Sequence, residues 1–249
     1  MQKGNIRRKA GIVLGVLILC GMTAGIQMLG DWLLRSADRT EEAEETAAQA
    51  GKEVEGQKDA AVIVVDSGHG GSDPGKVGIN GALEKDVNLS ISKKLQKCLE
   101  TEGYQVIMTR EDENGLADSK VEDMKTRVTL INEKKPLLAV SIHQNSYGQE
   151  SIHGAQVFYY THSGEGEKAA KVMQEALLGA DPDNTRQAKA NDTYYLLKRT
   201  EVPAIIVECG FLSNKEEADR LNTEEYQEKL AEAITRGIQT YAEENKKQE

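Results

Sequence analysis

Cysteine and positive charge are both in short supply in this chain. It has three cysteines, and one of them, Cys20, falls in an apolar N-terminal stretch, so a disulfide framework is excluded. Lysine and arginine together number 31 against 41 aspartates and glutamates, which gives a formal net charge of -10. Because phosphate contacts need a basic surface, we do not expect nucleic acid as a partner.

A phosphate-binding loop and a repeated module are also missing from the sequence. The glycine-rich stretch over residues 66–75 does not end in the Lys-Ser/Thr pair of a P-loop, and its glycines lack the spacing of a dinucleotide fingerprint. No segment repeats another, and the composition changes sharply only near the N-terminus. We therefore expect one folded domain, for which phosphate binding is a poor fit.

The N-terminal part of the chain has the pattern of a membrane anchor. Residues 10–30 contain no charged side chain, and residues 1–9 before them carry four lysines and arginines. Such a run is long enough to span a bilayer, and its basic flank predicts a cytoplasmic N-terminus with the rest of the chain outside the cytoplasm. Small residues over 23–25 also allow the alternative of a cleaved signal peptide.

The composition of residues 36–59 predicts a solvated, acidic tether. This segment carries eight acidic and three basic side chains, has no aromatic residue and offers almost nothing to bury. It is typical of a spacer between a membrane segment and a folded domain, and we assign it no chemistry.

Residues 60–245 alternate apolar, β-branched runs with amphipathic stretches, a pattern typical of an α/β domain. From Val87 to Leu99, apolar residues recur at helical spacing and predict a helix with one buried side. We expect strands over residues 61–66, 104–108, 137–142, 154–160 and 203–207, and helices over 87–99, 123–133, 165–178 and 224–244. This alternation predicts one sheet flanked by helices.

Four side chains suited to metal or proton chemistry stand at the ends of these elements. His69 follows the first strand on a glycine-rich turn, and Glu84 comes just ahead of the first helix. His143 closes a later strand, and Glu208 closes the last one. Because the carboxyl ends of several strands in an α/β sheet meet at one crevice, we expect the four side chains to converge.

These residue types fit a catalytic zinc. Such a zinc takes three protein ligands from histidine and carboxylate and leaves a fourth position to water. A second carboxylate that does not bind the metal can take up a proton and hand it to a leaving nitrogen. Glu208 is our candidate for this proton carrier. A histidine on a glycine-rich turn is by itself more often an ordinary loop residue, so the prediction depends on all four together.

Four segments around these residues occur in the order of the signature segments of a known enzyme family. They are VDSGHGG at 65–71, LEKDVN at 83–88, SIHQN at 141–145 and VECGFLSN at 207–214. With these segments the chain resembles the zinc-dependent N-acetylmuramoyl-L-alanine amidases, over residues 61–241.

The resemblance implies one zinc ion per chain, held by His69, Glu84 and His143, with Glu208 as the catalytic acid and base. It implies hydrolysis of the amide between the lactyl group of N-acetylmuramic acid and the L-alanine of the stem peptide. The partners are then the glycan strands and stem peptides of peptidoglycan. The implied fold is a mixed twisted sheet with helices on both faces, preceded here by the predicted transmembrane helix.

A narrower resemblance is carried by residues 108–112, 123–128, 184–189 and 195–198, which are similar to the germination-specific amidases of spore-forming bacteria. It implies a role in spore cortex maturation and germination, in which stem peptides are removed ahead of a muramic acid deacetylase and muramic-δ-lactam forms. The expected location is the space between the two membranes of the forespore. The chain departs from this pattern in a shorter segment between Asp112 and Glu122, and in Gln144, where a small or apolar residue is more usual.

Asn145, Arg186 and Lys189 are our candidates for contacts with the substrate. Arg186 and Lys189 carry the positive charge that would attract a carboxylate of the stem peptide, and Lys198 and Arg199 are further candidates. The alternative for these cations is a solvated surface without a binding role.

No plug for the active site is expected within the chain. Only residues 144–153 separate His143 from the next strand, which leaves no room for the long helix that closes the site in some relatives. We therefore expect control to come from expression, location or a separate activator protein.

Several alternatives stay open at this point. A general cell-wall remodelling amidase would carry the same motifs, and a wall-binding protein would keep the fold without turnover. A zinc hydrolase of another amide, such as a peptidase or a sugar deacetylase, would use the same ligands. A cysteine nucleophile at Cys209 is disfavoured, because the sequence places no histidine beside it.

Overall fold

The computed structural model describes residues 60–247. The predicted basic flank, membrane segment and acidic tether, at residues 1–9, 10–30 and 36–59, lie outside the described residues. Within residues 60–247, no helix is both long and apolar enough to cross a bilayer. The N-terminal anchor therefore stays a prediction.

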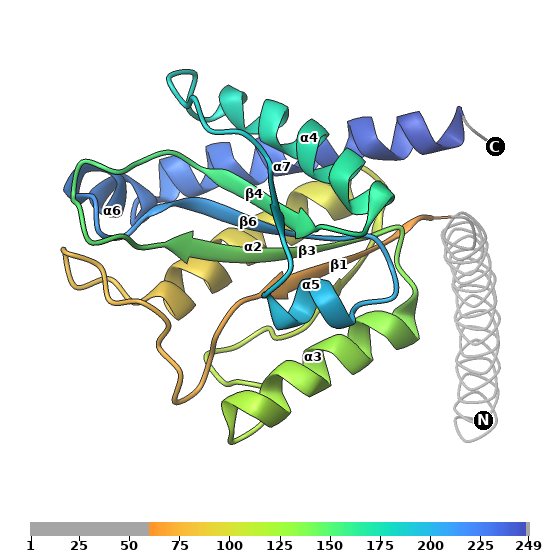
Figure 1. Ribbon diagram of the computed structural model, residues 1–249, viewed down its shortest axis with the longest axis horizontal. Helices are drawn as coiled ribbons and strands as arrows, with labels where there is room; N and C mark the ends of the chain where they lie inside the picture. The colour runs from red at the N-terminus through yellow and green to blue at the C-terminus, as the bar shows by residue number, and fades with distance from the viewer. Residues whose placement is uncertain (1–59, 248–249) are drawn as a thin grey trace, which may run out of the picture. The chain divides into compact units, whose positions relative to one another are not determined.

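A six-stranded mixed sheet forms the centre of the domain (Figure 1). Its strands are β1 (Val62–Ser67), β2 (Gln105–Met108), β3 (Leu138–Asn145), β4 (Gln156–Tyr160), β5 (Lys189–Asn191) and β6 (Ala204–Phe211), in the order β2-β1-β3-β6-β4-β5. Strands β2, β1, β3 and β6 run parallel, β4 runs antiparallel to β6, and β5 is parallel to β4. The predicted mixed α/β sheet is confirmed, and the carboxyl ends of β1, β3 and β6 lie at one edge.

Helices cover both faces of this sheet. They are α2 (Glu84–Thr101), α3 (Lys120–Lys134), α4 (Gly164–Ala176), α5 (Tyr195–Arg199), α6 (Lys215–Leu221) and α7 (Glu224–Lys246), with a short 3-10 helix, η2, at Leu177–Gly179. Helices α2 and α4 pack on one face, and α7 packs against both of them, whereas α3 and α5 pack on the other face (Figure 1).

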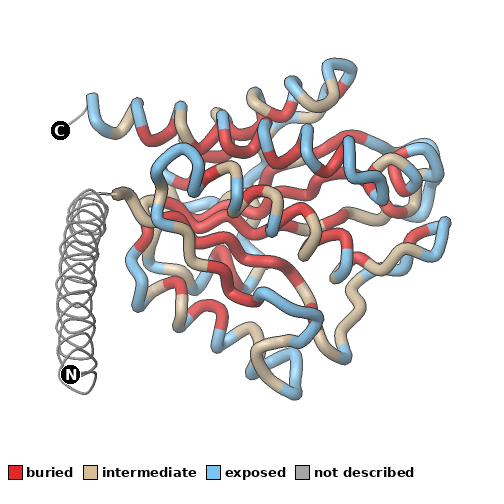
Figure 2. The backbone as a smooth tube through the Cα atoms, turned by 180° about the vertical axis from the view of Figure 1, so that it is seen from behind, coloured by how far each residue is buried: buried red, intermediate tan, exposed pale blue. Residues whose placement is uncertain are grey.

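Side chains that alternate along each strand separate two apolar layers. On β1, Ile63 and Val65 face the layer of α2, α4 and α7, whereas Val64 faces the layer of α3 and α5. The central strands are therefore buried on both faces (Figure 2). Burial on both faces explains why their sequences are continuous β-branched runs rather than an alternation of apolar and polar residues.

The predicted apolar stripe of α2 is confirmed, because Val87, Ile91, Leu95 and Leu99 are all buried in the same layer. Burial of each large aliphatic side chain contributes roughly 1.5–3 kcal/mol. This packing holds α2 firmly on the sheet. It therefore also fixes the position of Glu84, the first residue of the helix.

Helix α3 begins at Lys120, three residues before the start that the apolar pattern predicts. Ser119 precedes it as an N-cap, and its hydroxyl accepts a hydrogen bond from the Glu122 backbone N–H at 3.2 Å. Such a cap satisfies one of the free donors of the first turn and extends the helix beyond its apolar stripe.

His143 and Glu208 lie inside their strands rather than at the strand ends where we expected them. They face each other in register in the β3/β6 pair, and the strands continue to Asn145 and Phe211. Both side chains point to the α3/α5 face, which also carries Ala139 of β3 and Ile206 of β6. A polar residue at such a position ends the apolar run without ending the strand.

Candidate metal centre

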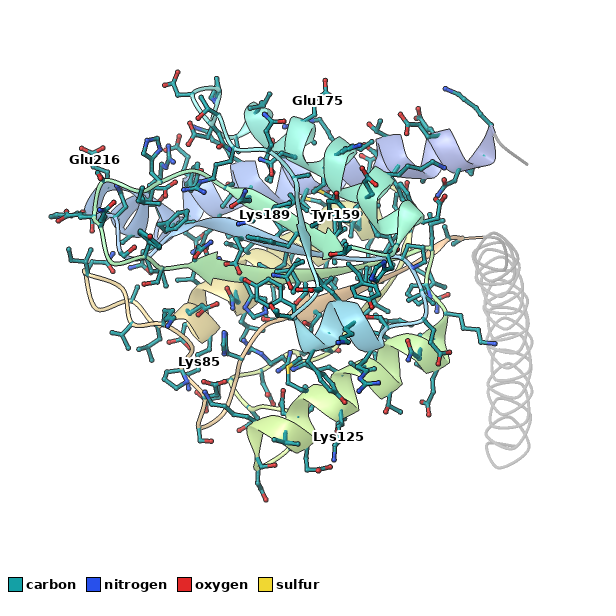
Figure 3. The ribbon with its side chains drawn as sticks, viewed as in Figure 1. Lys85, Lys125, Tyr159, Glu175, Lys189 and Glu216 are labelled. Atoms are coloured by element: carbon teal, nitrogen blue, oxygen red, sulfur yellow. The ribbon has the colours of Figure 1, made fainter. Side chains whose placement is uncertain are left out.

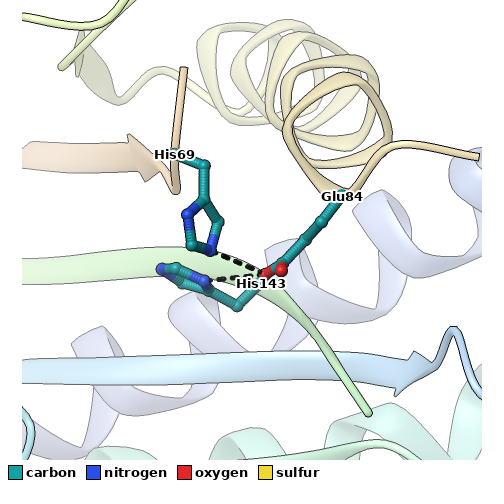
Figure 4. Close-up of side chains that lie close together, drawn as sticks. All are labelled: His69, Glu84 and His143. Atoms are coloured by element: carbon teal, nitrogen blue, oxygen red, sulfur yellow. Dashed lines mark hydrogen bonds and ion pairs between the residues drawn. The ribbon is translucent and has the colours of Figure 1, made fainter. Parts of the chain in front are cut away.

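His69, Glu84 and His143 come together at the carboxyl edge of the sheet (Figure 4). Glu84 Oε1 is 3.1 Å from His69 Nε2 and 3.0 Å from His143 Nδ1. The three donor atoms lie within 4.8 Å of one another. Two imidazole nitrogens and one carboxylate oxygen that converge in this way fit a divalent metal such as zinc.

Glu84 is buried and held from several sides. The backbone N–H of Lys76 donates to Oε2 at 2.8 Å, and that of Gln144 donates to Oε1 at 3.1 Å. Burial by itself would raise the pKa of Glu84, but His143 and His69 outweigh it and hold the pKa well below its usual range. Glu84 is therefore an ionised carboxylate in a fixed orientation at neutral pH.

His69 sits on a turn that two buried arginines hold in place. Its φ of 63° lies in the left-handed region, which a residue with a side chain rarely adopts. Arg127 Nη2 donates to the His69 carbonyl at 2.6 Å, and Arg110 Nη2 donates to the Gly68 carbonyl at 3.1 Å. Both arginines also donate to the carbonyl of Ser67. Hydrogen bonds from charged donors are strong, so they stabilise the unusual backbone conformation of His69.

The charge of Arg127 is balanced by two carboxylates. Its Nη1 is 2.7 Å from Asp66 Oδ1, and its Nε is 2.5 Å from Asp123 Oδ1. Asp66 also accepts hydrogen bonds from Thr109 Oγ1 at 2.8 Å and Ser141 Oγ at 2.5 Å. Burial would raise the pKa of Asp66, but Arg127 and Ser141 outweigh it and lower the pKa. Because its members are paired, this network avoids the cost of an isolated buried charge.

Asp73 is a site residue that the sequence analysis missed. Its Oδ2 lies 2.9 Å from His69 Nδ1, while the other ring nitrogen, Nε2, faces Glu84. Its Oδ1 forms an ion pair with Lys120 at 2.7 Å. A carboxylate on the second nitrogen of a ligand histidine fixes the tautomer and the ring orientation. The signal in the sequence is the carboxylate four residues after His69, in the same glycine-rich turn.

Two glycines make room for the side chains of His143 and Glu84. A Cβ atom at Gly68 would lie 2.3 Å from the His143 ring, and one at Gly75 would lie 2.5 Å from Glu84 Oε2. Gly75 also has a φ of 67°, in the left-handed region. The close approach of this turn to His143 and Glu84 explains why its sequence is rich in glycine.

Glu208 is the buried carboxyl beside His69, Glu84 and His143. It is 8% exposed, and within residues 60–247 its Oε2 has no hydrogen-bond partner. Burial raises the pKa of Glu208 to about 7. A carboxyl group with this pKa can take up and return a proton near neutral pH, as a general acid and base must.

The predicted substrate contacts differ in their placement. Asn145 lines the cleft at the metal centre. Arg186 is engaged elsewhere, because its Nε donates to the His153 carbonyl at 2.6 Å and its guanidinium lies 4.5 Å from the centre of the Phe211 ring. Lys189 begins β5 and is exposed near the edge of the sheet (Figure 3). Neither cation lines the two hollows next to the ligands, and their substrate contacts stay predictions.

Gln144, which departs from the usual residue at its position, is buried beside the ligands. Its Nε2 donates to Asn88 Oδ1 at 3.2 Å, and Asn88 Nδ2 donates to the Gly68 carbonyl at 3.1 Å. The Gln144 side chain therefore connects β3 through α2 to the turn of His69.

Cys209 lies on the opposite face of β6 from Glu208. It is fully buried in the apolar layer of α2, α4 and α7, and this burial raises the pKa of its thiol. A nucleophilic cysteine must be accessible and readily ionised, so Cys209 is excluded as the nucleophile.

A His/Glu/His set with a free carboxyl beside it is the arrangement of a metal-assisted hydrolase. The sequence profile of the N-acetylmuramoyl-L-alanine amidases matches residues 63–240. The chain belongs to this family, and its activity is that of an N-acetylmuramoyl-L-alanine amidase acting on cell-wall peptidoglycan.

The chain is similar to three characterised or structurally solved amidases. The germination-specific N-acetylmuramoyl-L-alanine amidase of Bacillus subtilis strain 168 is 40% identical over 188 residues, which cover 72% of this chain and 79% of that protein. The CwlD amidase from Clostridioides difficile, solved in complex with the GerS lipoprotein, is 39% identical with a TM-score of 0.71, covering 74% of this chain and 98% of that chain. The catalytic domain of CwlV from Bacillus (Paenibacillus) polymyxa var. colistinus is 31% identical with a TM-score of 0.67 and the same coverage, 74% and 98%. The predicted resemblance to germination-specific amidases is confirmed.

Proposed function

We propose that this amidase depends on zinc and cuts the amide between N-acetylmuramic acid and L-alanine. The observation that carries the proposal is the convergence of His69 Nε2, Glu84 Oε1 and His143 Nδ1 beside the carboxyl of Glu208. The Oε2 atom of that carboxyl has no hydrogen-bond partner among residues 60–247. The two histidines and Glu84 would hold the metal. When bound, zinc would polarise the substrate carbonyl and lower the pKa of a water molecule to about 7.

Glu208 moves the proton in this proposal. As a carboxylate it takes a proton from the attacking water, and as an acid it returns that proton to the nitrogen of the departing L-alanine. A carbon–oxygen bond forms and the amide carbon–nitrogen bond breaks, so the products are a free lactyl carboxylate and a free peptide amine. Glu84 is unsuited to this role, because its histidine neighbours hold its pKa low and it stays ionised.

The biological role in the proposal is spore cortex maturation and germination. It is supported by the 40% identity to the Bacillus subtilis germination-specific amidase. The enzyme would remove stem peptides from selected muramic acids ahead of a muramic acid deacetylase, so that muramic-δ-lactam forms. A null strain with a normal muramic-δ-lactam content, or with unseparated vegetative cells, would reject this role and favour a general cell-wall remodelling amidase.

The proposed location of the catalytic domain is outside the cytoplasm, in the space between the two forespore membranes. Residues 10–30 would hold it there as a single-pass membrane anchor. A separate activator protein also belongs to the proposal. The CwlD amidase was solved with the GerS lipoprotein, and in the described part of this chain the β3–β4 connection contains no helix that plugs the cleft. Fractionation of sporulating cells, with an antibody to the folded domain, would test the location.

Metal analysis and digestion of sacculi test the enzymatic proposal. The purified protein should carry one zinc per chain, and His69→Ala and His143→Ala should each lose it. Mass spectrometry of digested sacculi should detect free stem peptides that begin with L-alanine. If both variants kept stoichiometric zinc, the ligand assignment would be wrong. If the zinc-loaded protein released no peptide, a wall-binding protein would be favoured, and cleavage of another bond would favour a different zinc hydrolase.

A further inference from the structure

Two hollows of the domain join at the metal centre: the cleft that Asn145 lines, and a cavity lined in part by α3 and α5. The side chains that line both hollows are His69, Asp73, Lys120, His143, Tyr194 and Glu208. The two histidines would hold the metal, Glu208 would move the proton, and Asp73 contacts both His69 and Lys120. Tyr194 is the remaining side chain at this junction.

The backbone of Tyr194 is held on both sides. Tyr194 precedes α5, where the chain crosses from the edge strand β5 over the α3/α5 face of the sheet (Figure 1). The backbone N–H groups of Thr193 and Tyr194 each donate to Asn191 Oδ1 at 2.8 Å. The Tyr194 carbonyl accepts a hydrogen bond from the Lys198 N–H at 3.0 Å. The side chain of Tyr194 therefore leaves the backbone in a fixed direction.

The ring of Tyr194 is packed, but its hydroxyl is not bonded. The ring meets Phe158 of β4 edge to face, with centroids 5.5 Å apart and an angle of 82° between the ring planes. It also packs against the apolar layer of the α3/α5 face. Within residues 60–247 its hydroxyl forms no hydrogen bond. A packed ring with an unbonded hydroxyl at the junction of two hollows can offer that hydroxyl to a bound molecule.

The hydroxyl of Tyr194 is a hydrogen-bond donor near the carboxylates of the metal centre. Burial raises the pKa of Tyr194, and the negative charges of Glu208 and Glu84 raise it further. The phenol is therefore protonated at neutral pH, and its O–H can donate to an acceptor on the substrate.

The proposed reaction creates an acceptor for such a donor. When the carbon–oxygen bond forms, the electron pair of the carbonyl double bond moves onto the carbonyl oxygen, and it returns when the carbon–nitrogen bond breaks. A donor in a fixed position stabilises the charged oxygen more than the oxygen of the intact amide. Glu208 is committed to the proton that it passes to the departing nitrogen, and Lys120 is paired with Asp73. Tyr194 is free of both constraints.

We propose that the Tyr194 hydroxyl donates a hydrogen bond to the carbonyl oxygen of the scissile amide and stabilises the negative charge that this oxygen gains during the reaction. The proposal rests on the proposed amidase function and adds a residue to its catalytic machinery. The neighbouring Tyr195 is placed differently, because it lines the cavity but not the cleft and its ring lies 5.9 Å from the Arg199 guanidinium.

Tyr194→Phe tests the proposal by removing only the hydroxyl. Because this hydroxyl forms no hydrogen bond within the described residues, the variant should fold and bind zinc like wild type. Tyr160→Phe is the matched control. Tyr160 is a half-buried tyrosine against the same apolar layer, its hydroxyl is likewise unbonded within residues 60–247, and it lines neither hollow. Circular dichroism and zinc analysis establish that both variants are folded and loaded.

Kinetics with a soluble N-acetylmuramoyl dipeptide that begins with L-alanine give the first readout, at saturating zinc. Tyr194→Phe should lower kcat by about 10–100-fold and leave KM nearly unchanged, because a hydrogen bond to a charged oxygen is made mainly in the transition state. Tyr160→Phe should change neither quantity. An unchanged kcat for folded, zinc-loaded Tyr194→Phe would overturn the proposal, and so would a higher KM with an unchanged kcat.

Binding of a tetrahedral analogue gives a readout apart from turnover. In this analogue an anionic phosphinate replaces the scissile amide, so its oxygens resemble the charged oxygen of the reaction. Tyr194→Phe should raise the Kd of the phosphinate about 10–100-fold in calorimetry, whereas Tyr160→Phe should leave it unchanged. Equal Kd values for Tyr194→Phe and wild type would contradict a contact between the hydroxyl and this oxygen.

The pH profile separates a contact with the substrate from one with Glu208. The pH at which kcat/KM falls on the acidic side should be the same for Tyr194→Phe and wild type. A shift of that pH would show that the hydroxyl acts through Glu208, and the proposal would be wrong. Failure of the wild-type protein to cleave the dipeptide substrate or sacculi would instead overturn the proposed function, and the role of Tyr194 with it.

Discussion

Arg127 on α3 and Asp66 on β1 are 61 residues apart in the sequence, yet their side chains meet at 2.7 Å. Each side chain is 1% exposed, so neither charge has water as an alternative partner. Arg127 also donates to the carbonyl of His69, the residue that would supply the first metal ligand. The Arg127 guanidinium therefore both pairs with a buried carboxylate of the core and holds the backbone of His69 in place.

Arg127→Met should lower the free energy of unfolding by about 3–5 kcal/mol, because it leaves a buried carboxylate without its partner. Lys125→Met is the control on the same helix. Lys125 pairs with Glu122 at the surface, where Figure 3 shows it projecting from α3, and its loss should leave the unfolding midpoint nearly unchanged. Urea unfolding followed by circular dichroism measures both. Similar midpoints for the two variants would contradict the role of the buried pair.

The sheet and the convergence of His69, Glu84 and His143 could be predicted from the sequence, because the signals for both are local. The buried strands are β-branched runs, and the stripe on α2 from Val87 to Leu99 has clear helical spacing. His69 and Glu84 stand next to such elements, so their convergence followed from the parallel order of the strands. Elements too short to show a period, such as β5 and α5, were not predicted.

The parts of the site that the sequence did not predict depend on contacts between segments that are distant in the sequence. Arg110 and Arg127 fall in motifs that resemble the germination-specific subtype. No sequence pattern around them shows that Arg110 donates to the Gly68 carbonyl or that Arg127 donates to the His69 carbonyl. A cavity beside His69, His143 and Glu208 is likewise lined from several distant segments at once, among them α3, α5, β3 and β6. Arg186 has the charge for a substrate contact, yet the nearby His153 carbonyl and Phe211 ring engage its guanidinium.

Glu208→Gln should keep its fold and its metal while losing about 10²–10⁴-fold in kcat, because the amide has nearly the same size but cannot carry a proton. Zinc analysis and release of stem peptides from sacculi measure the two properties on the same sample. A variant that retains a near wild-type rate would assign the proton transfer to another group. Loss of zinc from the variant would show that Glu208 is a ligand instead.

The raised pKa of Glu208 also predicts a pH dependence of stability in metal-free protein. Its pKa is about 7 in the folded chain against 4.5 ordinarily, so between these values the folded state holds a proton that the unfolded state has released. The free energy of unfolding contributed by this group therefore falls as pH rises from 4.5 to 7. Since Gln does not ionise, metal-free Glu208→Gln should exceed wild type by up to about 3 kcal/mol above pH 7 and match it below pH 4.5. Urea unfolding of chelator-treated proteins across this range measures the difference, and a constant difference would contradict the assignment.

Asp73 should control how tightly the metal is held. Its carboxylate is 2.9 Å from His69 Nδ1, and removing such a partner of a ligand histidine typically weakens metal binding about 10–100-fold. Asp73→Ala should therefore raise the zinc dissociation constant by that factor, measured by competition with a chelator. Lys120→Met is the control, because it removes the ion pair at the other carboxylate oxygen and leaves the hydrogen bond to His69 in place. If Asp73→Ala bound zinc within about twofold of wild type, the orientation of His69 would have to come from the Arg127 and Arg110 hydrogen bonds alone.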